Sequence, residues 1–348
     1  MMLFRNATMD DLDAIHHLAV NAGIGITTLS KDKATLEKRL QWACDSFKKD
    51  IKKPKDEYYF FVLVDPKTQE IVGTSAIESC LGTRLPFYTY KLSTRSRFSK
   101  NLNIRTDYQV LSLVNDKHRC SEICTLFLHP DYRKNNNGQL LSRARFLFMA
   151  HYPKRFADVV IADMRGFSDE NGISPFWEAV GKHFFHMSFS KADELTLVTD
   201  KQLIADLMPR NPIYVCLLPK SAQAVIGKPH PSTVPALRIL EQEGFRYHQY
   251  IDIFDAGPTM EVKLPDIRTN RLSQQLTISS ISDTVTSQPY LVSHTHPQFK
   301  ATIAEVMINP ELKTCVISKE TARLLNCSIK DTLCVSPLTV NDDAHFKE

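Results

Sequence analysis

The sequence of 348 residues lacks any long apolar run. A helix that crosses a bilayer needs about 20 consecutive apolar residues, and no stretch of this chain approaches that length. The first residues, MMLFRNATMDDLDAI, soon turn polar and contain no small-residue cleavage site, unlike a secretory signal peptide. The sequence therefore predicts a cytoplasmic protein with no membrane partner.

The chain also has little excess charge. Its formal net charge is +4 at pH 7, and its basic residues are interleaved with acidic ones, so no field is strong enough to require nucleic acid. We expect no nucleic-acid partner, whereas a small anionic ligand is easily accommodated.

Dense cysteine spacing and metal-binding motifs are missing as well. The eight cysteines are scattered through the chain, which is typical of reduced thiols in a cytosolic protein. Cys120 and Cys124 have no second close pair, and His294 and His296 have no third ligand, so we predict no metal site.

Three common catalytic motifs are absent: the Gly-x-Ser-x-Gly elbow, the His-Glu-x-x-His pair and the Walker phosphate loop. Their absence leaves hydrolase, zinc-protease and ATPase functions without support.

The hydrophobic patterns that are present predict a mixed α/β fold, with helices packed on a largely antiparallel sheet. The segment 80–119 is irregular, basic and aromatic, and we interpret it as a functional insertion or a mobile loop. After about residue 270 the composition shifts toward Ser and Thr, which predicts a linker and then a small β-rich domain. The expected strands are residues 2–6, 58–65, 71–79, 120–128, 159–164 and 246–254, and the expected helices are residues 12–20, 33–47, 138–151, 174–181 and 235–243.

The most informative segment begins at Glu122, where an apolar strand passes through a polar loop directly into a helix. Backbone N–H groups at a helix N-terminus are unpaired and carry partial positive charge, so such a loop can hold a pyrophosphate. Asparagine and glycine suit the loop because they tolerate the left-handed backbone that turns N–H groups inward. By itself, however, the pattern fits an ordinary turn before a helix as well as an anion site.

The spacing Arg133-x-x-Asn136-x-Gly138 resembles the acyl-CoA loop of the GCN5-related N-acyltransferase (GNAT) superfamily, with Asn136 in place of the first glycine. The resemblance implies a GNAT-like mixed sheet flanked by helices, in which the strand before the loop separates from residues 159–164 and pairs with the pantetheine arm of CoA. The residues implied to bind acyl-CoA are Leu126, Phe127, Leu128, Arg133, Lys134, Asn136, Asn137 and Gly138.

Four segments give a more specific resemblance, to the arginine N-succinyltransferase family. They are residues 122–150, 174–189, 207–214 and 222–261, and generic acyltransferases share only the loop and the helix-Gly-Phe ends. The resemblance implies succinyl transfer from succinyl-CoA to the α-amino group of L-arginine, giving N2-succinyl-L-arginine and CoA, in the first step of arginine catabolism by the succinyltransferase pathway. Succinyl-CoA is then a co-substrate, and no cofactor is bound permanently. The family also implies a homo-oligomer or a pairing with a homologous subunit.

We expect three parts in the chain. Residues 1–195 form an acyl-CoA-binding N-acyltransferase-like domain, residues 196–270 form a second part of the acyltransferase region that carries His230, and residues 276–348 form the small β-rich domain.

Amide formation needs a neutral amine and a proton for the departing CoA thiolate, and histidine can serve either step. His230 lies between Pro229 and Pro231, which restrict the backbone and by themselves indicate an exposed loop histidine. In the family, however, the catalytic proton donor is the histidine of a Val-Ile-Gly-x-x-His-Pro segment, which corresponds to His230. The resemblance therefore implies that His230 is catalytic.

The acceptor site is left open by the sequence. Five carboxylates could face a guanidinium, but each is interpreted as solvated or structural: Glu122, Glu178, Asp252, Asp255 and Glu261. Ornithine as acceptor, acetyl-CoA as donor and other amino-acid N-acyltransfer remain alternatives, as do a non-catalytic acyl-CoA-binding subunit and a peptide acetyltransferase.

Overall fold

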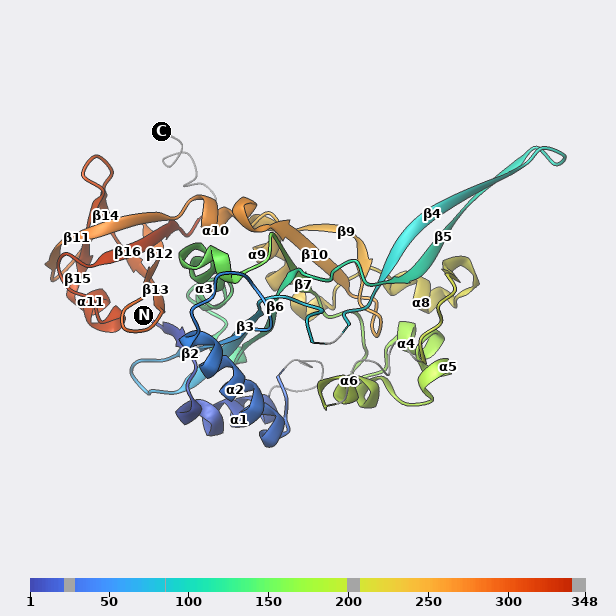
Figure 1. The fold of residues 1–348 in the computed structure, drawn as a ribbon, viewed down its shortest axis with the longest axis horizontal. Helices are drawn as coiled ribbons and strands as arrows, with labels where there is room; N and C mark the ends of the chain where they lie inside the picture. The colour runs from blue at the N-terminus through green and yellow to red at the C-terminus, as the bar shows by residue number, and fades with distance from the viewer. Residues whose placement is uncertain (22–28, 85, 199–206, 340–348) are drawn as a thin grey trace.

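The structure is a computed structural model that describes residues 1–21, 29–84, 86–198 and 207–339. It combines helices with one large mixed sheet (Figure 1). The strands are β1 (Leu3–Asn6), β2 (Tyr58–Val64), β3 (Ile71–Glu78), β4 (Thr89–Ser99), β5 (Ile104–Val114), β6 (Ser121–Leu128), β7 (Val159–Asp163), β8 (Ile213–Tyr214), β9 (Arg246–Ile251), β10 (Pro258–Lys263), β11 (Gln274–Ser282), β12 (Pro289–His294), β13 (Lys300–Glu305), β14 (Met307–Asn309), β15 (Thr314–Ser318) and β16 (Thr332–Pro337). The helices are α1 (Leu12–Asn21), α2 (Lys33–Lys48), α3 (Asn137–His151), α4 (Pro175–Ala179), α5 (Lys182–Phe185), α6 (Phe189–Val198), α8 (Lys220–Val225), α9 (Val234–Gln242), α10 (Arg268–Arg271) and α11 (Lys319–Leu325).

The strands of the described residues follow the order β14-β15-β11-β16-β12-β13-β1-β2-β3-β6-β7-β10-β9-β4-β5-β8. Among these pairings, β6 with β7 and β11 with β15 are parallel, and the others are antiparallel. The expected fold class, a GNAT-type mixed sheet flanked by helices, is confirmed.

The central strands carry a core on each face. On one face, α2 packs on β2 and α1 packs on β3 and α2, through side chains such as Leu40 and Ile15. On the other face, α3 contacts β3, β6, β12 and β13, with Leu141 and Phe148 fully or almost fully buried. Helix α3 therefore joins the central strands to the C-terminal ones.

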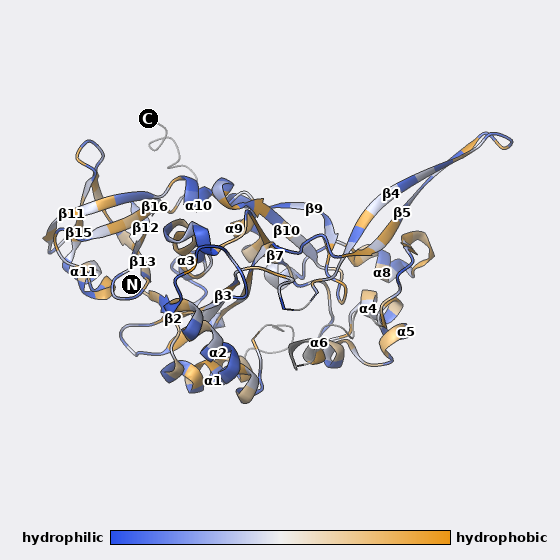
Figure 2. Cartoon of the chain, in the orientation of Figure 1, coloured by the Kyte–Doolittle hydropathy of each residue, from blue (hydrophilic) through white to orange (hydrophobic). Residues whose placement is uncertain are grey.

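The segment 80–119 is not irregular, so that expectation was wrong. It contains β4 and β5, which pair along their whole lengths to form an arm (residues 89–114) that projects from the body (Figure 1). Beyond its base the arm is solvated on both sides and largely hydrophilic (Figure 2), so it lacks the one-sided apolar alternation by which strands are recognised.

The predicted linker after residue 270 was also wrong in part. Residues 274–282 form β11, in which Leu276 and Ile278 are buried and the neighbouring residues Gln275 and Thr277 are exposed. The C-terminal strands join the sheet through β13, which pairs with β1 at Phe4 and Ala301. In the part of the chain that the structure describes, no helix is long and apolar enough to cross a membrane.

Candidate active site

β6 and β7 separate along their length. These parallel strands pair only near their starts, where Glu122 lies beside Ile161, whereas β6 continues to Leu128. On the other side of β6, the register with β3 shifts around Thr125, whose φ is 55°. No strand of the described residues pairs with the β7 side of β6 beyond Glu122, so this edge has the separation expected for an acyl-CoA strand.

The loop of residues 129–136 joins β6 to α3 and is held at both ends. The Nε of Arg133 donates to the backbone oxygen of Leu128 at 3.1 Å. The side-chain amide of Asn137 donates to the backbone oxygen of Tyr132 at 3.0 Å. These two hydrogen bonds fix the loop against the end of the strand and the start of the helix.

The last two loop residues adopt the left-handed conformation. Asn135 has a φ of 52° and Asn136 a φ of 61°, in a region that only Gly and, less often, Asn or Asp visit routinely. The first i to i−4 bond of α3 runs from Leu140 N to Asn136 O at 2.9 Å, so the N–H groups of Gly138 and Gln139 precede it. The loop therefore has the backbone geometry that binds anions at helix N-termini.

The side chains of the three expected strand residues are mainly buried. Phe127 belongs to the core under α1 and α2, Leu128 belongs to the core under α3, and Leu126 is half-buried. These residues can therefore face a ligand mainly through their backbone groups at the β6 edge.

The expected loop residues differ in exposure. Arg133, Lys134 and Asn136 are exposed, while the side chain of Asn137 is buried and closes the loop. A Cβ added at Gly138 would meet only Leu128 Cδ2, at 4.0 Å, so packing within the chain does not require glycine there.

His230 begins the turn that leads into α9. Its N–H donates to the backbone oxygen of Arg165 at 2.7 Å, and Arg165 follows closely on β7. Four residues beyond the paired Glu122 and Ile161, β6 reaches Leu126 and the chain after β7 reaches Arg165. His230 is therefore held on the β7 side of the two separated strands, level with Leu126 of β6.

The His230 ring is half-buried and held by defined contacts. Its Nδ1 accepts from Ser232 N at 3.2 Å and lies 2.7 Å from Ser232 Oγ, and Phe167 stacks on the ring with centroids 6.2 Å apart. Burial lowers the pKa of His230, as does the charge of Arg165, while a backbone hydrogen bond with Ser168 opposes them. Because Nδ1 accepts from an N–H, the proton of the neutral ring lies on Nε2.

Two of the five candidate carboxylates accept hydrogen bonds from backbone N–H groups. Asp255 is buried and accepts from Gly166 N at 2.7 Å, which joins the β9–β10 connection to the segment after β7. Asp252 accepts from the N–H of Phe254 at 2.7 Å. Both carboxylates therefore stabilise the turn before β10.

Two more have cationic partners. Glu261 forms an ion pair with the buried Lys117, and Glu178 pairs with Lys182 on the surface at 2.5 Å. Glu122 is half-buried on β6, where the strands begin to separate.

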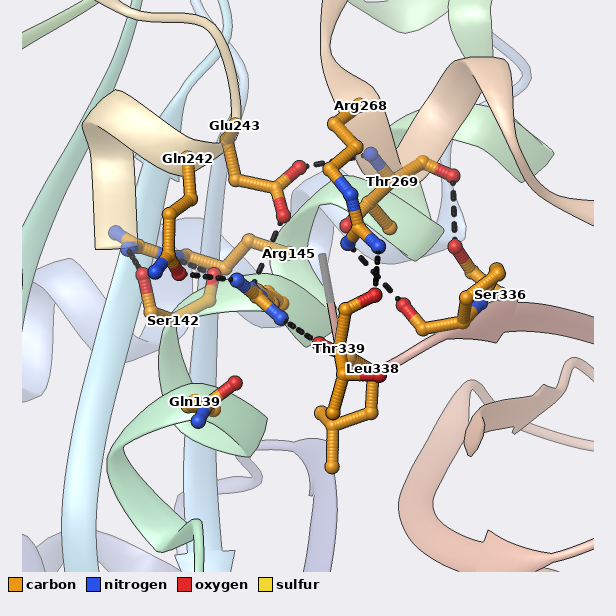
Figure 3. A network of polar contacts seen from close by, with 12 residues as sticks. Gln139, Ser142, Arg145, Gln242, Glu243, Arg268, Thr269, Ser336, Leu338 and Thr339 are labelled. Carbon is orange, nitrogen blue, oxygen red and sulfur yellow. Dashed lines mark hydrogen bonds and ion pairs between the residues drawn. The ribbon is translucent and has the colours of Figure 1, made fainter. Parts of the chain in front are cut away.

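Two arginines of α3 are not singled out by the sequence reasoning. Arg143 and Arg145 are each 1% exposed. Arg143 forms an ion pair with Glu243, whereas Figure 3 shows Arg145 turned toward Ser142 of its own helix. The signal that could have found them is a pair of charged residues inside a run of buried helix positions.

Among the described residues, no group of three or more His, Cys, Asp or Glu side chains is placed to hold a metal ion.

The chain is similar to known proteins over nearly its whole length. A Pseudomonas aeruginosa protein named arginine N-succinyltransferase subunit beta is 42% identical over 338 residues, which cover 97% of this chain and 98% of the relative. An Escherichia coli arginine N-succinyltransferase is 40% identical over 334 residues, which cover 95% and 96%. The solved structure of arginine/ornithine succinyltransferase subunit AI from Pseudomonas aeruginosa superposes with a TM-score of 0.89 at 34% identity, covering 97% of this chain and 99% of that one.

The family model for the arginine N-succinyltransferase beta subunit matches residues 2–269. This match spans the separated strand, the 129–136 loop and His230. The chain therefore belongs to the arginine N-succinyltransferase beta subunit family.

Proposed function

We propose that the chain transfers the succinyl group of succinyl-CoA to the α-amino group of L-arginine, giving N2-succinyl-L-arginine and CoA. This reaction is the first step of arginine catabolism by the succinyltransferase pathway. The observation that carries the proposal is the separated β6 strand, which runs through the left-handed Asn135–Asn136 turn into the N-terminus of α3, in a chain of this family.

Succinyl-CoA is the co-substrate in this proposal. The backbone N–H groups of Gly138 and Gln139 donate to its pyrophosphate at the positive end of α3, and the exposed Arg133 and Lys134 add charge there. The backbone of residues 126–128 pairs with the pantetheine arm as an added strand would.

His230 serves the departing CoA in this mechanism. The α-amino nitrogen of arginine attacks the thioester carbon, and the C–S bond then breaks. The protonated ring of His230 donates from Nε2 to the sulfur as negative charge develops there and is left as the neutral ring, while the proton that the attacking amine releases passes to solvent. Backbone N–H groups around the irregular position Thr125 stabilise the oxyanion on the carbonyl.

Ornithine is the second candidate acceptor, because the solved relative is named an arginine/ornithine succinyltransferase. The two acceptors share the α-amino and α-carboxylate groups and differ in the length and end group of the side chain. A site that hydrogen-bonds the guanidinium in two places would favour arginine.

The deciding experiment is an assay of the purified chain with arginine or ornithine, each with succinyl-CoA or acetyl-CoA. Thiol release is followed together with the product mass. We expect the highest kcat/KM for arginine with succinyl-CoA. A higher kcat/KM with ornithine would make ornithine the acceptor, and a higher kcat/KM with acetyl-CoA would make acetyl-CoA the donor. CoA binding without thiol release under any combination would indicate a non-catalytic subunit.

We also propose a cytoplasmic location and an oligomer, formed either from copies of this chain or with a homologous subunit. All eight cysteines are free thiols, as in a reducing compartment, and the family is named for a subunit. Light scattering of the purified chain, alone and with co-expressed homologues, measures the assembly; a monomer under both conditions would contradict it.

A further inference from the structure

Two arginines stand two positions apart on α3 in similar burial but in different electrostatic surroundings. Arg143 faces the carboxylate of Glu243 and also donates to Gln242 Oε1 at 2.8 Å. Arg145 has no carboxylate partner among the residues that the structure describes. A buried charge is costly unless it is paired, so Arg145 is the anomalous member of the pair.

The hydrogen bonds of Arg145 leave part of its guanidinium unused. Its Nε donates to Ser142 O at 3.0 Å, its Nη2 to Ser142 Oγ at 3.2 Å and its Nη1 to Cys124 O at 3.5 Å. These contacts use three of the five N–H donors of an arginine, and the last lies at the outer limit of hydrogen-bond distance. Burial lowers the pKa of Arg145 to about 10, so the group still carries its charge at neutral pH.

The position of Arg145 relates it to the acyl-CoA strand. Arg145 lies eight residues after Asn137, about 12 Å along the helix axis at 1.5 Å per residue. Cys124 lies four residues before Leu128, about 13 Å along β6. Helix α3 and strand β6 therefore extend from the loop over a similar distance. The guanidinium of Arg145 contacts β6 at Cys124, next to the irregular Thr125. The pantetheine arm can span this distance from the loop.

We propose that Arg145 binds the terminal carboxylate of the succinyl group and thereby selects succinyl-CoA over donors without that carboxylate. The inference rests on the proposed function, because it requires acyl-CoA to lie along β6. A carboxylate arriving there replaces the long contact with Cys124 O and supplies the counter-charge that the chain itself does not provide. A donor without a carboxylate leaves the guanidinium buried and unpaired, and a site of that kind rejects such analogues strongly.

The test compares Arg145→Met with Arg143→Met on the full chain. For each protein, kcat/KM is measured with succinyl-CoA and with butyryl-CoA, which has the same four-carbon chain without the carboxylate, and the melting temperature is recorded without ligand. Wild type should prefer succinyl-CoA, and Arg145→Met should lower that preference by roughly 30-fold or more while its melting temperature does not fall. Arg143→Met should keep the preference and melt at a lower temperature.

An unchanged donor preference in Arg145→Met would overturn the inference, and a lowered melting temperature alongside it would make Arg145 a structural residue. If Arg145→Met does not fold, the same ratio is measured on Arg145→Lys, which keeps the charge but loses the planar fork; its preference should be reduced but still present. Equal use of the two donors by wild type would instead contradict the succinyl part of the proposed function.

Discussion

The Nε of Arg143 lies 3.0 Å from Oε1 of Glu243, and neither side chain has more than 1% of its surface exposed. Glu243 caps the C-terminal end of α9, and its other oxygen accepts from Thr269 N at 2.7 Å. Arg143 also donates to the backbone oxygen of Leu338, beyond β16. The ion pair therefore connects the helix after the 129–136 loop with the helix after His230, and Arg143 also ties both to the segment after β16.

Removing one member of this pair should destabilise the protein strongly. We expect Glu243→Gln or Arg143→Met to lower the free energy of unfolding by about 3–5 kcal/mol, because the remaining polar group stays buried without its partner. The double variant Arg143→Met with Glu243→Leu should lose less than either single change. Urea unfolding measures all three, and single variants as stable as wild type would contradict the coupling.

Replacing His230 should affect turnover more than binding. His230→Ala is expected to lower kcat by about 100- to 10,000-fold, the usual contribution of a general acid or base, with little change in succinyl-CoA affinity. His17→Ala, at an exposed position on α1, is the control and should keep full activity. Near-normal turnover of His230→Ala would remove this histidine from the mechanism.

The left-handed backbone at Asn136 predicts which substitutions this position tolerates. Asn136→Gly should be tolerated, whereas Asn136→Val should cost about 1–2 kcal/mol of stability and raise the KM for succinyl-CoA, because a β-branched residue resists a φ of 61°. Calorimetric titration with CoA gives the affinity separately from turnover. Equal affinities for the glycine and valine variants would show that the turn does not shape the site.

His151 should make stability depend on pH. Burial, with a smaller contribution from the nearby His294, lowers the pKa of His151 to about 4, against 6.5 for the unfolded chain. The unfolded state therefore binds the proton more readily, and about 3 kcal/mol of stability present above pH 6.5 is lost as the pH falls through 4. His151→Gln should flatten this part of the stability curve, with His17→Gln as the control. Parallel curves for wild type and His151→Gln would contradict the assignment.

The strands and helices that the sequence predicts well are those that bury one face or both faces in the core. The β2–β3 hairpin follows from a run of aromatic and β-branched residues, all of them buried in β2. The strand, loop and helix over residues 120–151 follow from an apolar strand that ends at His129-Pro130 and from the apolar spacing of α3. These patterns directly record burial, which is why they place the strand, the loop and the helix, whereas the acyl-CoA role of the loop is implied only by the resemblance of residues 133–138.

The parts that sequence does not predict depend on contacts across long distances. The arm lacks a buried face, and in β11 the short alternation of Leu276 and Ile278 with polar residues is masked by the Ser- and Thr-rich composition around it. The burial of Arg143 and Arg145 depends on α9 and β6 lying against α3, and nothing local to residues 143–145 indicates which charge finds a carboxylate. The anchoring of His230 to Arg165 likewise joins segments 65 residues apart.

The pairing of β1 with β13 has a consequence for synthesis. Phe4 leaves the ribosome nearly 300 residues before its partner Ala301, which at about 5–20 residues per second is a delay of roughly 15–60 s. Throughout that interval one edge of β1 has only solvent or another chain to bond with. One of the earliest strands of the newly made protein therefore keeps an unpaired edge until one of its latest strands arrives, and in the interval that edge can pair with another chain.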